Sequence, residues 1–197
     1  MKKRITFGVC LFLGISLLYG CGGSKELKLS SVDTDTIYVS EDGSIELANV
    51  EEFDKEYYSK SQLEDFIEET IDTYKETKDS GEVNKEDFSV KDDVAKVLLK
   101  FDSAQTYADF QRIDFQVVPT EDIEGNLVLP ETFVSADDGS SVSKETVLKE
   151  KGLKILIINE PLHVQLDGTI KYYSEASITG DNLAETTGEK TAVIVYE

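Results

Sequence analysis

The sequence predicts an α+β fold, in which a mostly antiparallel sheet built from hairpins carries one long and one or two short amphipathic helices. Three observations support this class. Short alternating apolar segments flank the turn sequences Glu41-Asp42-Gly43 and Asp167-Gly168, which is typical of β-hairpins. The segment between Ser59 and Gly81 instead repeats its apolar residues at helical spacing. Strands joined by short turns pair antiparallel, and helices interspersed among such strands favour an α+β fold.

The first hairpin is expected around residues 41–43. Pairing Ser40 with Ser44 leaves a three-residue loop, in which Gly43 takes the left-handed conformation that such a loop needs. In this register the apolar residues of both strands share one face of the sheet. These residues are Ile37, Val39, Ile45 and Leu47.

The long helix is predicted after this hairpin, because five apolar residues fall on one helical face. They are Leu63, Phe66, Ile67, Ile71 and Tyr74. Two starts stay open: Ser61 with Glu64 forms a capping box, and Ser59 with Gln62 offers a competing one. Gly81 lies just beyond the expected end.

Two more hairpins are predicted further along the chain. One turns at Asp92-Asp93 through a two-residue loop, which aligns the alternating apolar residues between positions 88 and 101. The other turns at residues 166–168 and pairs Gln165 with Thr169. The cross-strand pairs that follow from this second register are Val164 with Ile170 and Leu162 with Tyr172.

The remaining elements are shorter. A second helix is expected from Ser103, with Ala104, Tyr107 and Phe110 directed inward, and a third from Ser143 to Lys151. Further strands are expected at Phe115–Val118, Thr132–Ser135, Leu153–Ile158 and Ala192–Tyr196. Because no linker-like segment interrupts residues 34–197, we expect a single domain there, with two lobes that meet near residues 120–130 as the alternative.

Residues 1–20 have the features of a lipoprotein signal peptide. Three cationic residues precede an apolar segment from Ile5 to Tyr19, which is shorter than the about 20 residues of a membrane-spanning helix. The segment ends in Leu18-Tyr19-Gly20-Cys21, which resembles the bacterial lipobox. This resemblance implies cleavage before Cys21 and a diacylglyceryl group on that cysteine, an anchor strong enough for stable membrane attachment. Residues 21–33 are then expected to form a flexible tether.

The charge of the chain limits its partners. Removal of residues 1–20 takes away three of the 20 basic residues and none of the 40 acidic ones, which leaves a net charge near −23. Such a charge disfavours nucleic acid, whose binding depends on basic residues, and also an electrostatic contact with anionic lipids. A solvated acidic surface is the favoured interpretation, and a divalent cation or a basic partner is the alternative.

Few residues of the mature chain suit catalysis or metal binding. Cys10 is in the signal peptide and Cys21 carries the lipid, so no thiol remains for a disulfide or a nucleophile, and no cofactor is expected. The one histidine, His163, alternates with Leu162 and Val164 and should face solvent. Asp137 and Asp138 are weak candidates for a calcium site, because two adjacent carboxylates supply too few of the six to eight oxygens that Ca²⁺ takes.

Two short strings recur in enzyme families but lack the context of those families. Asp33-Thr34-Asp35-Thr36 matches the string of phosphatases with an aspartyl nucleophile, yet no buried strand precedes it, so we interpret it as a polar lead into the first strand. Ser141-Val142-Ser143-Lys144 contains the SxxK string of penicillin-binding proteins, and we interpret its serines as helix caps. No catalytic residue is therefore predicted.

Four motifs together resemble a known group of proteins. They are Phe53-Asp54-Lys55-Glu56-Tyr57-Tyr58-Ser59, Val94-Ala95-Lys96-Val97, the segment from Ser103 to Phe110, and Ile170-Lys171-Tyr172-Tyr173-Ser174. With the lipobox, they resemble a family of uncharacterised Gram-positive lipoproteins of clostridial-type bacteria, to which no activity is assigned. The resemblance covers most of the mature chain and implies a lipid-anchored protein on the extracytoplasmic face of the cell membrane.

The sequence therefore favours a membrane-anchored lipoprotein that acts as a non-catalytic binding or interaction module, and it predicts no enzyme. A protein or a cell-wall component stays open as the partner, and the oligomeric state is not predicted. The alternatives are a carboxylate-based cell-wall hydrolase, which needs two facing acidic residues with raised pKa values in a pocket, and a calcium-dependent adhesion or signalling protein.

Overall fold

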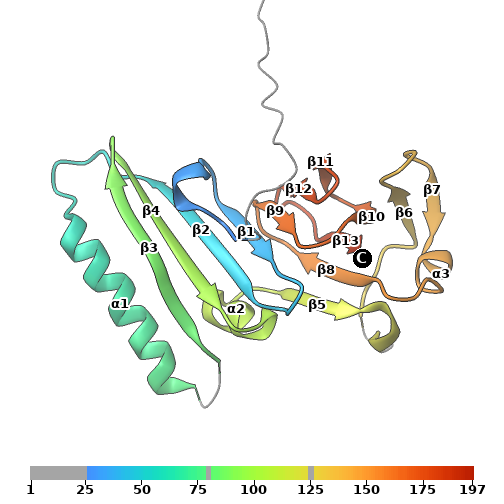
Figure 1. The fold of residues 1–197 in the computed structure, drawn as a ribbon, viewed down its shortest axis with the longest axis horizontal. Coiled ribbons are helices and arrows are strands. Elements are labelled where there is room, and N and C mark those ends of the chain that lie inside the picture. Colours follow the sequence, from blue (N-terminus) through green and yellow to red (C-terminus); the bar gives the residue numbers. More distant parts are fainter. Residues whose placement is uncertain (1–25, 79–80, 124–126) are drawn as a thin grey trace, which may run out of the picture.

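The computed structural model describes residues 26–78, 81–123 and 127–197 (Figure 1). The predicted signal peptide 1–20, the lipobox residues Leu18, Tyr19 and Gly20, and the predicted lipidation site Cys21 lie outside the described residues. The described part confirms an α+β fold rich in antiparallel strands. Three α-helices accompany the strands in these ranges: α1 (Lys60–Thr77), α2 (Ala104–Gln111) and α3 (Lys144–Val147).

The strands form two sheets (Figure 1). The seven-stranded sheet has the order β11-β12-β9-β1-β2-β4-β3, with β1 (Thr36–Val39), β2 (Ile45–Glu52), β3 (Val83–Lys91), β4 (Val94–Phe101), β9 (His163–Leu166), β11 (Ser177–Gly180) and β12 (Leu183–Glu185). The six-stranded sheet has the order β5-β8-β13-β10-β6-β7, with β5 (Phe115–Pro119), β6 (Thr132–Ser135), β7 (Ser141–Ser143), β8 (Lys154–Ile158), β10 (Ile170–Ser174) and β13 (Ala192–Tyr196). Short 3₁₀ turns lie at Leu29–Ser31 and Thr120–Asp122.

One large core joins the two sheets. It combines inner side chains of the first sheet, such as Ile37 and Phe101, with Leu156 and Ile194 of the second sheet. Strand β8 alternates, since Leu156 contributes to this core while Ile155 packs on the other face of its sheet. The parallel pair β1–β9 brings strands from before and after residues 120–130 into one sheet.

Two predicted hairpins are confirmed in register. In the first, Val39 lies opposite Ile45 and Gly43 takes a φ of 88°, the left-handed conformation of a three-residue loop. In the hairpin of β3 and β4, Asp92 and Asp93 have φ values of 52° and 60°. Positive φ at both central residues gives the twist that a two-residue turn needs, and aspartate tolerates it better than most residues.

The predicted hairpin at residues 166–168 is wrong. Strand β9 pairs with β1 and β12 in the first sheet, whereas β10 pairs with β13 and β6 in the second, so the chain crosses between sheets here. Instead of Gln165, Thr169 exchanges two backbone hydrogen bonds with Glu197. A side chain at Gly168 would place its Cβ 2.2 Å from the backbone oxygen of Glu197, so this glycine permits a close approach of the C-terminus.

The helices begin where serine side chains cap them. Ser59, the second of the two predicted starts, caps α1, Ser103 caps α2 and Ser143 caps α3. Helix α3 ends at Val147, earlier than the predicted Lys151. On α1, Ile71 and Tyr74 are buried as predicted, but Phe66 is 64% exposed.

The start of the described chain differs from the predicted tether, which was expected to extend to residue 33. We call residues 26–32 the lead segment. Leu27, Leu29 and Val32 are buried on the outer face of the first sheet against Tyr38 and Leu98. Their apolar side chains cover a sheet face that solvent would otherwise reach, so this part of the predicted tether belongs to the folded domain.

Candidate functional site

The residues that the sequence singled out for chemistry have structural roles. His163 faces solvent on β9, where its Nε2 lies 3.6 Å from Oε1 of Glu185 on the neighbouring strand. In the aspartate string, Oδ1 of Asp35 accepts the N–H of Val50 at 2.7 Å and fastens the start of β1 to β2. Ser143 accepts the N–H of Thr146 at 3.3 Å, so the SxxK string forms a helix cap.

The weak metal candidates Asp137 and Asp138 lie in the turn between β6 and β7. Oδ1 of Asp138 accepts the N–H of Ser140 at 2.9 Å, and hydrogen bonds from Ser140 lower the pKa of this carboxyl. Within the described ranges, no three His, Cys, Asp or Glu side chains come together as a metal site. The structure therefore gives these two carboxylates a turn-forming role.

Two concave surfaces lie elsewhere. The first is a cleft of about 440 Å³ beside the β1–β2 turn, which we call the acidic cleft. Five carboxylates and one amine, that of Lys100, line it. The carboxylates belong to Glu26, Glu41, Asp42, Glu46 and Asp167.

Glu46 is the most buried carboxylate of the acidic cleft, with 4% of the residue exposed. Its Oε2 accepts the N–H of Leu27 at 2.7 Å, and its Oε1 lies 3.7 Å from Nζ of Lys100. Burial raises the pKa of Glu46, although both neighbours partly oppose this shift. The side chain thereby fastens the lead segment to β2.

Asp42, another carboxylate of the acidic cleft, also serves the fold. Hydrogen bonds from Ser40 and from the Ser44 N–H lower the pKa of Asp42 to about 2, so this carboxylate stabilises the β1–β2 turn. Burial, together with the nearby carboxylate of Asp167, raises the pKa of the Tyr38 hydroxyl. The pKa values of Glu46 and Asp42 move in opposite directions, so this pair differs from the two raised carboxyls expected above for a hydrolase, and backbone N–H groups already engage both carboxylates.

The second concave surface is a groove of about 390 Å³ between α1 and α2, which we call the α1–α2 groove. The rings of Tyr74 and Phe110 meet edge to face at 5.4 Å and provide apolar lining. Phe66 stands at one wall, and a row of α1 hydroxyls lines the same side. These hydroxyls are those of Thr70, Thr73 and Thr77.

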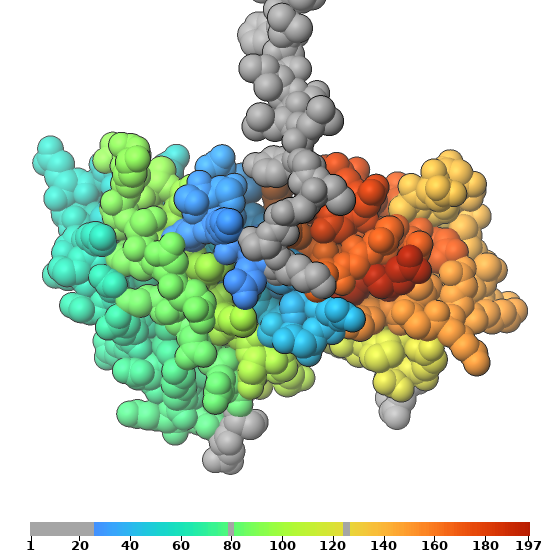
Figure 2. Space-filling model, in the orientation of Figure 1, coloured from blue at the N-terminus to red at the C-terminus, as the bar shows by residue number. Residues whose placement is uncertain are grey.

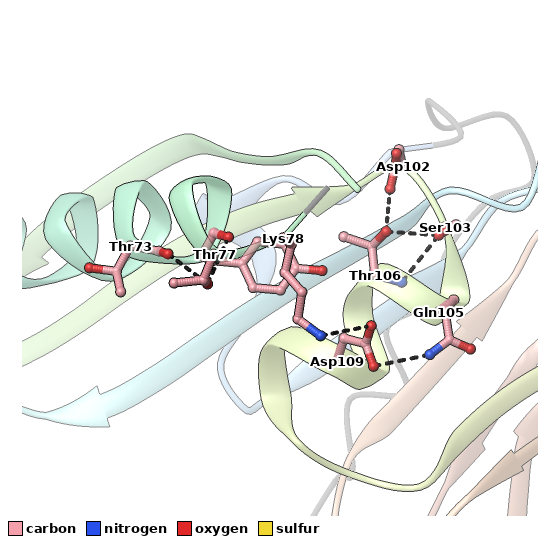
Figure 3. A network of polar contacts seen from close by, with 9 residues as sticks. Thr73, Thr77, Lys78, Asp102, Ser103, Gln105, Thr106 and Asp109 are labelled. Carbon is pink, nitrogen blue, oxygen red and sulfur yellow. Dashed lines mark hydrogen bonds and ion pairs between the residues drawn. The ribbon is translucent and has the colours of Figure 1, made fainter. Parts of the chain in front are cut away.

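Polar contacts hold the two helices together at one end of this groove (Figure 3). Nζ of Lys78, the C-cap residue of α1, lies 3.4 Å from Oδ2 of Asp109 on α2. The amide of Gln105 donates to the other oxygen of Asp109 at 3.0 Å. Nearby, Thr106 donates to Asp102 at 2.6 Å. The ion pair of Lys78 with Asp109 therefore links α1 to α2 at this end of the groove, and the other two contacts are local to α2 and the residues before it.

Sequence reasoning found neither concave surface, because each combines elements that are distant in the chain. The α1–α2 groove needs a helix from each side of the β3–β4 hairpin, and the acidic cleft joins the lead segment, the first hairpin and Asp167. One signal was available: Leu27 and Leu29 alternate with polar residues, as in a segment that packs on a surface.

Over the described ranges, no helix combines the length and the apolar character needed to cross a bilayer. The predicted lipidation of Cys21 and the resemblance to clostridial-type lipoproteins stay predictions, since the lipobox lies outside the described residues. The chain matches no protein-family model, no curated protein and no solved structure.

Proposed function

We propose that the protein is a lipid-anchored binding module, without catalytic activity, on the extracytoplasmic face of the cell membrane. The observation that carries this proposal is the exposed ring of Phe66, beside an apolar groove on a highly acidic domain. Exposed apolar surface in a concave site is the usual mark of a place where a partner binds.

The lead segment supports a position close to the membrane. Because Leu27 is already packed on the sheet, at most residues 21–26 lie between the proposed lipid and the folded domain. Six residues reach at most roughly 20 Å even when fully extended. The domain is therefore held near the headgroups instead of being displayed on a long stalk.

Photo-crosslinking on the native membrane tests this proposal. A photoreactive amino acid in place of Phe66 should give light-dependent adducts with a partner, and the same amino acid in place of Val128, which is 88% exposed, is the matched control. Adducts at position 66 that disappear with Cys21→Ser but persist with Cys10→Ser support anchored binding. Equal labelling at both positions, or none at position 66, contradicts it.

A further inference from the structure

Helix α1 presents two neighbouring rows of side chains outside the core. Phe66, Thr70, Thr73 and Thr77 follow one another at intervals of four, three and four residues and line the α1–α2 groove. Four exposed carboxylates repeat with the same spacing beside them. We call these carboxylates the acidic stripe: Asp65, Glu69, Asp72 and Glu76.

The acidic residues of α1 fall into two groups. Glu64 and Glu68 lie on the side of β3, where Nζ of Lys85 contacts both, at 2.8 Å in the case of Glu64. In the described part of the chain, no ion pair engages a member of the acidic stripe. Glu69 also lines the groove itself. An apolar groove with an unneutralised acidic border thus lies along one helix.

We propose that the α1–α2 groove binds a basic amphipathic helix of a partner protein. The apolar side of that helix covers Phe66 and the ring of Phe110, and its lysines or arginines meet the acidic stripe. The proposal rests on the binding function proposed above and specifies the chemistry of the partner.

Charge selects this partner over other occupants. A second copy of the mature chain would bring one acidic stripe against another acidic protein of net charge near −23. An anionic lipid surface or a nucleic acid is repelled for the same reason. Helix α1, in teal, lies at the left end of the molecule, where its surface is accessible (Figure 2).

The geometry also sets the length and direction of the bound helix. Phe66 and Thr77 are about 16 Å apart along the helix axis at 1.5 Å per residue, which corresponds to three turns. The cationic residues of the groove are Lys78, the C-cap of α1, which already pairs with Asp109, and Arg112, the C-cap of α2. The basic residues of the partner therefore face the middle and the N-terminal half of α1, and its end near Arg112 is neutral or acidic.

A designed peptide tests the proposal. The probe is a fluorescent amphipathic helix of about 14 residues, four turns, composed of leucine and lysine at helical spacing. Its two controls are a scrambled sequence and a version with glutamate in place of lysine. The full anchored protein is used in nanodiscs of neutral phosphatidylcholine, with empty nanodiscs as the blank, and binding is followed by fluorescence anisotropy.

Two matched double variants separate the groove from general charge. Glu69→Lys with Asp72→Lys reverses half of the acidic stripe and should weaken binding by about ten-fold or more. Glu145→Lys with Glu189→Lys makes the same change of net charge at exposed sites elsewhere and should leave the affinity within about two-fold. Phe66→Ser should also weaken binding by about ten-fold, through lost apolar contact. Circular dichroism confirms that each variant is folded.

Several outcomes overturn the proposal. They are equal weakening by both double variants, equal binding of the scrambled or glutamate peptide, and absence of binding by the lysine peptide. If position 66 still crosslinks to a partner on the native membrane while the lysine peptide does not bind, the binding function stands and the basic helix is wrong. If position 66 gives no crosslink and the lysine peptide does not bind, the groove is not a binding site.

Discussion

Replacement of Glu46 should loosen the lead segment, and two substitutions separate its hydrogen bond from its charge. In Glu46→Ala the N–H of Leu27 loses the acceptor that lies 2.7 Å away in a buried position. A buried donor left unpaired costs about 1–3 kcal/mol. Because the side chain that filled the site is also lost, we expect the free energy of unfolding to fall by about 2–3 kcal/mol. In Glu46→Gln the amide oxygen keeps the acceptor, so the loss at neutral pH should be small.

The pH dependence distinguishes the two states of this carboxyl. Folding raises its pKa above the ordinary value of 4.5, so the folded protein holds the proton more tightly than the unfolded chain does. The stabilisation that follows is complete below pH 4.5 and disappears as the pH rises through the raised value. Compared with Glu46→Gln, the unmodified protein should therefore lose relative stability as the pH increases over this interval.

Urea unfolding between pH 4 and 7 measures the free energy of unfolding of Glu46→Ala and the pH dependence relative to Glu46→Gln. Hydrogen exchange at the Leu27 amide shows whether the change lies in the lead segment. The matched control is Glu52→Ala, an exposed glutamate at the end of the same strand, which should change stability by less than about 0.5 kcal/mol. If Glu46→Ala costs no more than Glu52→Ala, or if exchange at Leu27 stays unchanged, Glu46 does not fasten the lead segment. A relative stability that rises with pH would contradict the direction of the pKa shift.

Four further substitutions probe the fold. Gly81→Ala should cost about 2–4 kcal/mol in urea unfolding, because Gly81 has a φ of 99° and a Cβ would lie 2.7 Å from Oγ1 of Thr106; a cost below 1 kcal/mol would exclude this contact. Tyr196→Phe should leave stability unchanged or raise it by about 1 kcal/mol, because within the described residues its buried hydroxyl has no hydrogen-bond partner; a marked loss on thermal unfolding would reveal one. Ser59→Ala should destabilise by about 0.5–1 kcal/mol and Ser61→Ala by less, since Ser59 is the cap; the reverse order would assign the cap to Ser61.

The sequence predicted those features of the fold that depend on residues close together in the chain. The register of the first hairpin follows from alternation and from Gly43, and the two-residue turn follows from the same alternation at Asp92-Asp93. The crossing at Gly168 could not be predicted in this way. The apolar alternation there is satisfied equally well by strands from elsewhere, and the decisive contact, with Glu197, is remote in the chain.

The exposure of Phe66 shows a second feature that the spacing of apolar residues cannot predict. Helical spacing correctly assigned this residue to the apolar side of α1, but it lies at the edge of that side, next to the α1–α2 groove. Whether an edge position is covered depends on where α2 packs, and periodicity contains no such information. For the same reason periodicity could not predict the groove, whose two walls come from separate helices that the ion pair of Lys78 with Asp109 links.

The four carboxylates of the acidic stripe repel one another, and this repulsion lowers the stability of α1. Neighbours three or four residues apart on a helix repel when they carry the same charge, at a cost of about 0.2–0.5 kcal/mol for each pair. The acidic stripe contains three such pairs, so about 1 kcal/mol of helix stability is forgone on the exposed side. On the side of α1 that faces β3, Lys85 relieves the same repulsion between Glu64 and Glu68. A basic helix in the α1–α2 groove would relieve the rest, so binding should protect the amides of α1 from exchange as well as bury Phe66.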